Sequence, residues 1–500
     1  MIPVHINERE FLFLHAINHF HSKASHLPAM TASLEHIHHL YWRAGFGPNV
    51  TTFNQQGSTL AKEEVELLFE KSKLFIPYTV PDWEMKTNAE LKRLSDEEKK
   101  AYTKKEKDTH AFIIKEIEDR QAFSESCLRE KMTLFWIGLF ACRIAKLDFM
   151  IKYYNTISEH ALGSFSDLLN GMIHNAALLQ YLDNDLNKNT HPNENFAREL
   201  MELFTLGIVI YTENDIKESA RAFTGWRFDS YGNYVFLQKV HDEGIKNFMG
   251  QSGNFDGNDI ARIILEKKEC AIYITTRIYK YFVNYKLDPL RITELSNQFY
   301  DSGYDIGKLM KTIFSADWFY NKENIGQRIK SPLELQAGIT KMFNITFEDP
   351  FMRVPVLKVL GQSLFTPPSV AGWPDGLSWI DSSTLLFRIR IPEMYLQDAQ
   401  SLVVPKENFD AQEKMMMSNP ANLSPGKKTK THYKATYFAD RFKNIPAKEL
   451  TGAMSDFLLM AYPGAAKLKM IDQYTAQSEG TTRILRTAVY LMSLPEYQLS

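Results

Sequence analysis

The sequence predicts a mainly α-helical protein, built as one large multi-helix domain with a small β-hairpin insertion. Apolar residues recur at helical spacing through most of the chain, and Gly or Pro separates the periodic segments. One segment, 231–240, instead combines aromatic and β-branched residues with a Gly-Asn turn, as a short hairpin does. A hydrophobic content of 44% in 500 residues is enough to bury a sizeable core.

Composition divides the chain into four parts. Residues 1–32 are a His-rich N-terminal segment, 33–402 the main helical domain, 403–432 a flexible polar insertion, and 433–500 helices that pack on the main domain. Within the main domain, residues 84–121 are dense in Lys and Glu, and we expect them to form a solvated helical arm.

Helical periodicity places the individual helices. Segment 123–142 is so strongly apolar that we expect a central buried helix there, and Gly163 and Gly171 are expected to break the helical segment that follows it. The expected helices cover residues 33–48, 59–70, 123–142, 148–180, 260–285, 292–300, 305–320, 331–344, 384–398, 447–460 and 480–493.

Segment 191–226 is the most informative run of the chain, and its pattern predicts two short helices joined by a tight connection. Gly207 suits a left-handed cap at the end of the first helix. Thr212 and Asp215 have the spacing of a capping box at the start of the second helix, which Gly225 would end.

Charged residues on this helical hairpin are the first candidates for a functional site. Glu199 and Glu202 lie three residues apart on one face, where two carboxylates would share acid/base work or bind a cation. Arg198 or Arg221 would hold these carboxylates or an anionic group. A capped hairpin with surface salt bridges explains the same pattern. The spacing matches no strong metal motif, so metal and cofactor stay unassigned.

Two further segments add candidates. His241 beside Asp242 suits a base with its orienting group, although adjacent residues seldom point the same way. Trp373 and Trp379 lie in a turn-rich loop, 361–381, where they either stack on a flat or sugar-like ligand or pack under the loop. The candidate catalytic residues are Glu199, Glu202 and His241, and the candidate ligand-binding residues are Asn195, Arg198, Arg221, Trp226, Asp242, Lys246 and Trp373.

Composition also excludes several classes of protein. A formal net charge of -2 argues against a general binder of nucleic acid or anionic membranes. The three cysteines form no C-x-x-C pair, and no run of 18 apolar residues predicts a transmembrane helix. The first twenty residues lack a basic region and are interrupted by charges, so we expect no signal peptide and a cytoplasmic location by default.

Several motifs together resemble one family, the bacterial DUF1800 proteins, which have no established function. Among them are PNENFARELMELFTLG, KSPLE and PPSVAGWPDG. The matching runs cover residues 39–48, 181–184, 192–207, 211–226, 241–250, 330–334, 367–376 and 494–498. In one helix the family commonly reads Phe-Trp-His-x-His-Phe, whereas Ile137 and Leu139 stand at the two histidine positions here.

The resemblance implies a mostly helical domain and a DUF1501-family partner that looks like an alkaline-phosphatase-type hydrolase. Relatives often carry export signals, so the envelope or periplasm is the alternative location. Two functions are therefore expected. The first is an accessory or binding protein that acts with a hydrolase-like partner on polysaccharide. The second is a hydrolase whose acidic, Arg and His site is built on the 191–226 hairpin.

Overall fold

Helices dominate the computed structural model of the protein, which describes residues 32–50, 61–80, 83–208, 210–349, 352–397 and 430–500. The strands in these ranges form three two-stranded antiparallel sheets, so the expected mainly α-helical class is confirmed. The predicted segment 1–32 and most of the predicted insertion 403–432 lie outside the described residues. In the described part, no helix is long and apolar enough to cross a membrane.

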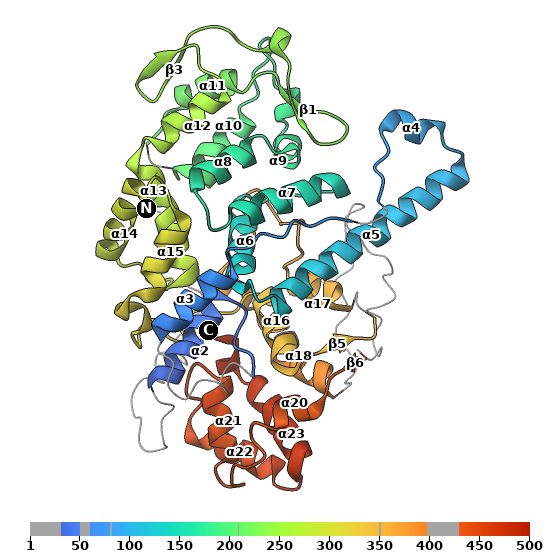
Figure 1. Cartoon of the computed structure of the whole chain (residues 1–500), viewed down its shortest axis with the longest axis vertical. Helices are drawn as coiled ribbons and strands as arrows, with labels where there is room; N and C mark the ends of the chain where they lie inside the picture. The colour runs from blue at the N-terminus through green and yellow to red at the C-terminus, as the bar shows by residue number, and fades with distance from the viewer. Residues whose placement is uncertain (1–31, 51–60, 81–82, 209, 350–351, 398–429) are drawn as a thin grey trace.

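Of the helices before residue 182, α6 lies near the middle of the molecule in Figure 1. Nearly every side chain of α6 is buried, as expected for a central helix. Gly171 lies inside α8 and does not break it. These helices are α2 (Ala32–Ala44), α3 (Ala61–Lys71), α4 (Asn88–Arg93), α5 (Asp96–Phe123), α6 (Cys127–Leu139), α7 (Leu147–His160), α8 (Phe165–Ile173) and α9 (Ala176–Tyr181).

The charged segment forms α4 and α5, and only part of it is a solvated arm. Figure 1 shows α4 and the first turns of α5 projecting from the body. The second half of α5 is buried, including Ile113, Ile117 and Glu118. There Arg353, from α17 (Arg353–Val359), forms an ion pair of 3.4 Å with Glu118. The high Lys and Glu content of the segment made its buried apolar positions hard to recognise in the sequence.

The 191–226 segment folds as two short helices, as expected. The first begins as α10 (Asn195–Glu199) and continues as a π-helical turn, η3 (Leu200–Thr205). The second, α11 (Glu213–Ala222), has the predicted capping box between Thr212 and Asp215. Gly207 has a φ of 73°, the left-handed conformation expected after the first helix.

The predicted hairpin at 231–240 is shifted toward the N-terminus. Strand β1 (Trp226–Phe228) pairs with β2 (Tyr234–Phe236), and Gly232 lies in the turn with a φ of 72°. Two further small sheets have strands too short to leave a sequence pattern. They are β3 (Lys246–Phe248) with β4 (Gln251–Gly253), and β5 (Thr346–Phe347) with β6 (Thr431–His432).

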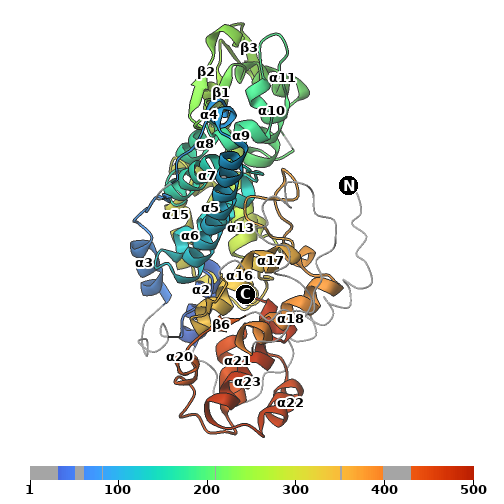
Figure 2. The same ribbon diagram turned by 90° about the vertical axis from the view of Figure 1, so that its right-hand side faces the viewer.

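The remaining helices lie beside α11, near the centre, along one side and at the far end of the molecule. Figure 1 shows α13 to α15 along one side, and both views show the C-terminal helices at the end opposite β1 and β3 (Figures 1 and 2). They are α12 (Gly257–Leu265), α13 (Lys268–Phe282), α14 (Pro289–Asp301), α15 (Ile306–Ser315), α16 (Pro332–Phe343), α18 (Ser382–Leu396), α20 (Ala435–Ala439), α21 (Leu450–Leu458), α22 (Ala465–Thr475) and α23 (Gly480–Met492).

Glu118 predicts a measurable pH dependence of stability. Burial raises the pKa of Glu118 to about 7, although the charge of Arg353 opposes the shift. Between about pH 4.5 and 7 the folded protein keeps this proton while the unfolded chain has lost it, so stability falls as pH rises through this window. Glu118→Gln should therefore gain roughly 1–3 kcal/mol more, relative to wild type, at pH 8 than at pH 5.

The measurement is urea unfolding at both pH values. Glu97→Gln, an exposed site on the same helix, is the control and should show no such difference. An equal effect of Glu118→Gln at both pH values would contradict the assignment.

Candidate functional site

The predicted carboxylate pair lies on the first helix of the hairpin. Glu199 ends α10, Glu202 lies in the π-helical turn, and both side chains are half-buried. Within the described residues neither makes a hydrogen bond or an ion pair. Burial raises the pKa of Glu199, and the negative charge of Glu202 adds to the shift. The two charges therefore lie close together without an ion-paired cation.

The two predicted arginines are paired with other carboxylates. Arg198 donates to Glu213 at 2.9 and 3.0 Å and to Glu194 at 3.2 Å. Arg221 donates to both oxygens of Asp242, at 2.7 and 3.0 Å, and to Glu218 at 3.0 Å. Bidentate pairs of this kind fix the Arg side chains in place.

His241, Asp242 and Lys246 gather beside Arg221, in the segment that leads into β3. The backbone oxygen of Thr224 lies 2.8 Å from Nδ1 of buried His241. The Nζ atom of Lys246 is buried and donates to the backbone oxygen of Asp242 and, at 3.1 Å, to Asn254. These hydrogen bonds fix the positions of His241 and Lys246. The atoms that form them are bound by other groups of the protein.

The two Trp candidates and Asn195 lie in different places. Trp226 is buried and stacks on His174 at 4.5 Å. Asn195 donates to the backbone oxygen of Leu182 at 3.3 Å. Trp373 packs with Trp379 in a separate apolar cluster. In the described part of the chain, no hydrogen bond or ion pair links Glu199 or Glu202 to His241 or Trp373, so a shared catalytic site stays a prediction.

Among the residues that the structure describes, no group of three or more His, Cys, Asp and Glu side chains is arranged to hold a metal ion. The three cysteines are buried and unpaired.

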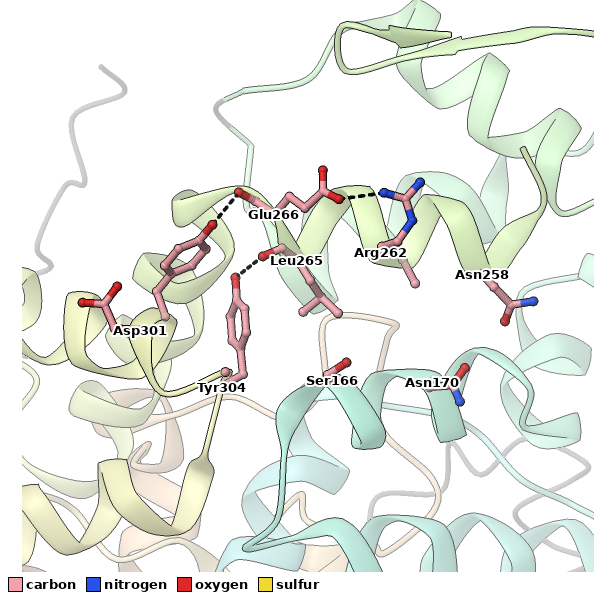
Figure 3. Close-up of a pocket in the computed structure, with 11 residues that line it drawn as sticks. Ser166, Asn170, Asn258, Arg262, Leu265, Glu266, Asp301 and Tyr304 are labelled. Atoms are coloured by element: carbon pink, nitrogen blue, oxygen red, sulfur yellow. Dashed lines mark hydrogen bonds and ion pairs between the residues drawn. The ribbon is translucent and has the colours of Figure 1, made fainter. Parts of the chain in front are cut away.

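A groove of about 620 Å³ runs between α8, α12 and the connection from α14 to α15 (Figure 3). Asn170 of α8 and Asn258 of α12 lie at one end, and Asp301 and Tyr304 lie at the other. The side chains of Ser166 and Asn170 make no hydrogen bond within the described residues. Most of the polar groups here are uncharged or, like Arg262 and Glu266, paired with each other at 2.6 Å.

Backbone contacts hold the groove rigid. The backbone N–H of Phe165 donates to the backbone oxygen of Tyr304 at 2.9 Å. The backbone N–H of Ile306 donates to the backbone oxygen of Gly163, also at 2.9 Å. The hydroxyl of Tyr304 donates to the backbone oxygen of Leu265 at 2.8 Å, which ties the loop to the end of α12. Tyr304 has a φ of 65°, a conformation that non-glycine residues rarely adopt.

A second, smaller cavity of about 80 Å³ lies under the predicted Trp loop. Trp373 and Trp379 line it together with residues of α6 and α13. Gly372 has a φ of 86° and lies so close to the backbone oxygen of Gly138 that a side chain would overlap it. The loop therefore docks directly on the last turn of α6. The cavity is far smaller than the roughly 300–1,000 Å³ typical of small-molecule sites.

A family model described as "Protein of unknown function (DUF1800)" matches residues 39–499. The chain belongs to the DUF1800 family. Neither the comparison with curated proteins nor that with solved structures gives a match. In this DUF1800 chain, residues of the runs 330–334 and 367–376 meet at the Trp-loop cavity. Of the two positions that depart from the family pattern, Leu139 lines that cavity and Ile137 is buried in the core.

Sequence reasoning missed the charged residues around this cavity, chiefly Lys131, Arg328 and Glu334. Two signals would have pointed to them. Lys131 lies in a helix that the sequence predicts to be buried, where a charge needs a partner. Ser331 and Glu334 form a capping box with Pro332 at the first helical position, a strong helix start that also fixes the carboxylate.

The carboxylate pair of this DUF1800 protein yields a stability prediction. Because the pKa of Glu199 is raised, ionisation of Glu199 costs stability as pH rises above its ordinary range. Glu199→Gln should leave the protein folded and should raise its melting temperature at pH 8 more than at pH 4.5. Differential scanning calorimetry, with Glu213→Gln as the control that loses an ion pair, measures this. A lower melting temperature for Glu199→Gln at pH 8 would show that a cation holds the pair.

Proposed function

We propose that this protein is an accessory protein that binds an uncharged segment of polysaccharide in the groove between α8 and α12. The main support for the proposal is the volume of the groove. Its volume of about 620 Å³ falls within the roughly 300–1,000 Å³ of small-molecule sites, whereas the Trp-loop cavity is far smaller.

The lining of the groove suits a saccharide. Saccharide hydroxyls both donate and accept hydrogen bonds, and amide and hydroxyl side chains do the same. Ser166 and Asn170 offer such groups, because neither side chain is used within the described protein. The amide nitrogen of Asn258 donates to Asp256 at 3.2 Å, which leaves its oxygen directed elsewhere. The tyrosines supply apolar surface beside these groups.

Binding without catalysis is favoured because, within the described residues, no hydrogen bond or ion pair joins the predicted acid/base residues Glu199, Glu202 and His241. The hydrolytic step would belong to a hydrolase-like partner of the DUF1501 type, which the family resemblance suggests. A protein that works on polysaccharide would act at the cell envelope or in the periplasm, and we propose that location in place of the cytoplasmic default.

One observation favours the alternative, a hydrolase built on the 191–226 hairpin. Glu199 and Glu202 are half-buried and form no ion pair within the described residues, and burial raises the pKa of Glu199, a common property of general acids. In that case Glu199→Gln would abolish hydrolysis of a polysaccharide by the purified protein, whereas an accessory protein has no such activity to lose.

The groove predicts which side chains determine saccharide affinity. Asn170→Ala and Asn258→Ala should each weaken binding of a neutral oligosaccharide about 5-fold, the effect of losing roughly one neutral hydrogen bond. Isothermal titration calorimetry against a panel of neutral glucan, mannan and xylan oligosaccharides measures the affinity. Asn297→Ala, at an exposed position of α14, is the matched control. Binding that both groove variants leave unchanged, or no binding across the panel, would overturn the proposal.

A further inference from the structure

The Trp-loop cavity has a positively charged wall. Arg277 and Lys280 of α13 and Arg328 all line it. The one carboxylate in the lining, Asp375, forms an ion pair with Lys280 at 3.1 Å. Arg277 makes no hydrogen bond or ion pair with any described residue. Two of the three cations in the wall therefore have no carboxylate of the lining to balance them.

Buried hydrogen-bond donors of this wall lack acceptors. Arg328 is only 3% exposed, and its Nε and Nη1 atoms are buried without a hydrogen-bond acceptor. The indole Nε1 of Trp373 is also buried without an acceptor. A buried donor left unpaired costs about 1–3 kcal/mol, and more when the donor is charged. The buried donors of Arg328 and Trp373, which lie far apart in the sequence, therefore both lack an acceptor.

A surplus of positive charge lies behind Arg328. Glu334 forms an ion pair with Lys131, and Nη1 of Arg328 lies 3.7 Å from the same carboxylate oxygen. Arg43, Lys330 and Arg388 are fully buried near these groups. Their charges act on one another, because Arg328 lowers the pKa of Arg43, and Arg388 and Lys131 lower that of Lys330, in each case after the larger effect of burial.

Among the described residues, Glu334 pairs with Lys131 and Arg328, and the side chains of Arg43, Lys330 and Arg388 form no ion pair. The interior tolerates buried charge only when it is paired. Lys330 is partly accommodated by the rings of Trp42 and Tyr497, at 3.7 and 3.9 Å. Of the five cations Arg328 is the one that lines the cavity, so a negative charge placed there would act on the cluster through Arg328.

We infer that the Trp-loop cavity binds a small oxyanion, such as a phosphate, sulfate or carboxylate group, between Arg328, Arg277 and the indole N–H of Trp373. The volume of about 80 Å³ lies well below the roughly 300–1,000 Å³ of sites for drug-sized ligands, which suits a small group better than a large ligand. The anion is either free in solution or the charged substituent of a larger molecule whose remainder lies outside the cavity. This site is separate from the groove and does not depend on the saccharide proposal.

The test uses the full-length protein and two variants that keep the Glu334 ion pairs intact. Arg277→Gln removes a cation that has no ion pair, and Trp373→Phe removes the indole N–H while keeping an aromatic ring. Lys308→Gln, an exposed cation of α15, is the control for loss of one positive charge. Inorganic phosphate, sulfate and glucuronate are the probes, with chloride at matched ionic strength.

Thermal unfolding and calorimetric titration should show saturable binding of phosphate or sulfate to the wild type and to Lys308→Gln. Arg277→Gln and Trp373→Phe should each weaken it about 10-fold or more, as expected for the loss of a hydrogen bond to a charged group. Tighter binding of glucuronate than of phosphate would identify a saccharide-borne carboxylate as the ligand. Tighter binding of phosphate than of glucuronate would identify a free oxyanion.

Salt exclusion from the protein surface also raises melting temperatures, but it does not saturate and is the same for all variants. The inference would be overturned if the melting temperature rose without saturation and equally in all variants. Equal affinities of the wild type, Arg277→Gln and Trp373→Phe would also overturn it. The groove variants Asn170→Ala and Asn258→Ala should bind phosphate like the wild type, so failure here is distinguishable from failure of the saccharide proposal.

Discussion

Glu334, buried at the start of α16, is the carboxylate around which the charged groups of the interior are arranged. It accepts the backbone N–H of Ser331 at 2.7 Å and also pairs with Lys131 from the middle of α6. Burial alone would raise the pKa of Glu334, but Lys131 and Arg328 lower it to about 2, so it stays ionised. One side chain therefore caps α16 and joins it to the central helix.

Other buried contacts extend from this joint to the ends of the chain. Lys330 donates to the backbone oxygen of Tyr497 at 2.7 Å, and Arg388 donates to Gln498 at 2.9 Å. Arg43 of α2 donates to the backbone oxygen of Asn324 at 2.7 Å. The first described helix and the last residues of the chain thus meet the same buried cluster. The cluster also supplies Arg328 to the wall of the Trp-loop cavity, which connects the interior with a site open to a ligand.

Local patterns predicted much of this architecture, because helix periodicity, capping boxes and left-handed glycines depend on residues a few positions apart. The buried α6, the Thr212–Asp215 capping box and the Gly207 cap were all accessible in this way. The Lys131–Glu334 pair spans 203 residues, and nothing local reveals such a contact. For the same reason the candidate site was predicted only in fragments: Arg221, Asp242 and Lys246 do meet, whereas no hydrogen bond or ion pair of the described residues joins Glu199 or Trp373 to them.

The stability of Glu334 and Lys131 variants tests the central claim most directly. Removing one partner of a buried ion pair typically costs about 3–5 kcal/mol, whereas replacing both by apolar groups costs far less. A double-mutant cycle with Glu334→Leu, Lys131→Met and the double variant, followed by urea unfolding, measures the coupling. We predict that each single variant is strongly destabilised and that the double variant recovers part of the loss. Single variants as stable as the wild type, or strictly additive losses, would contradict the account.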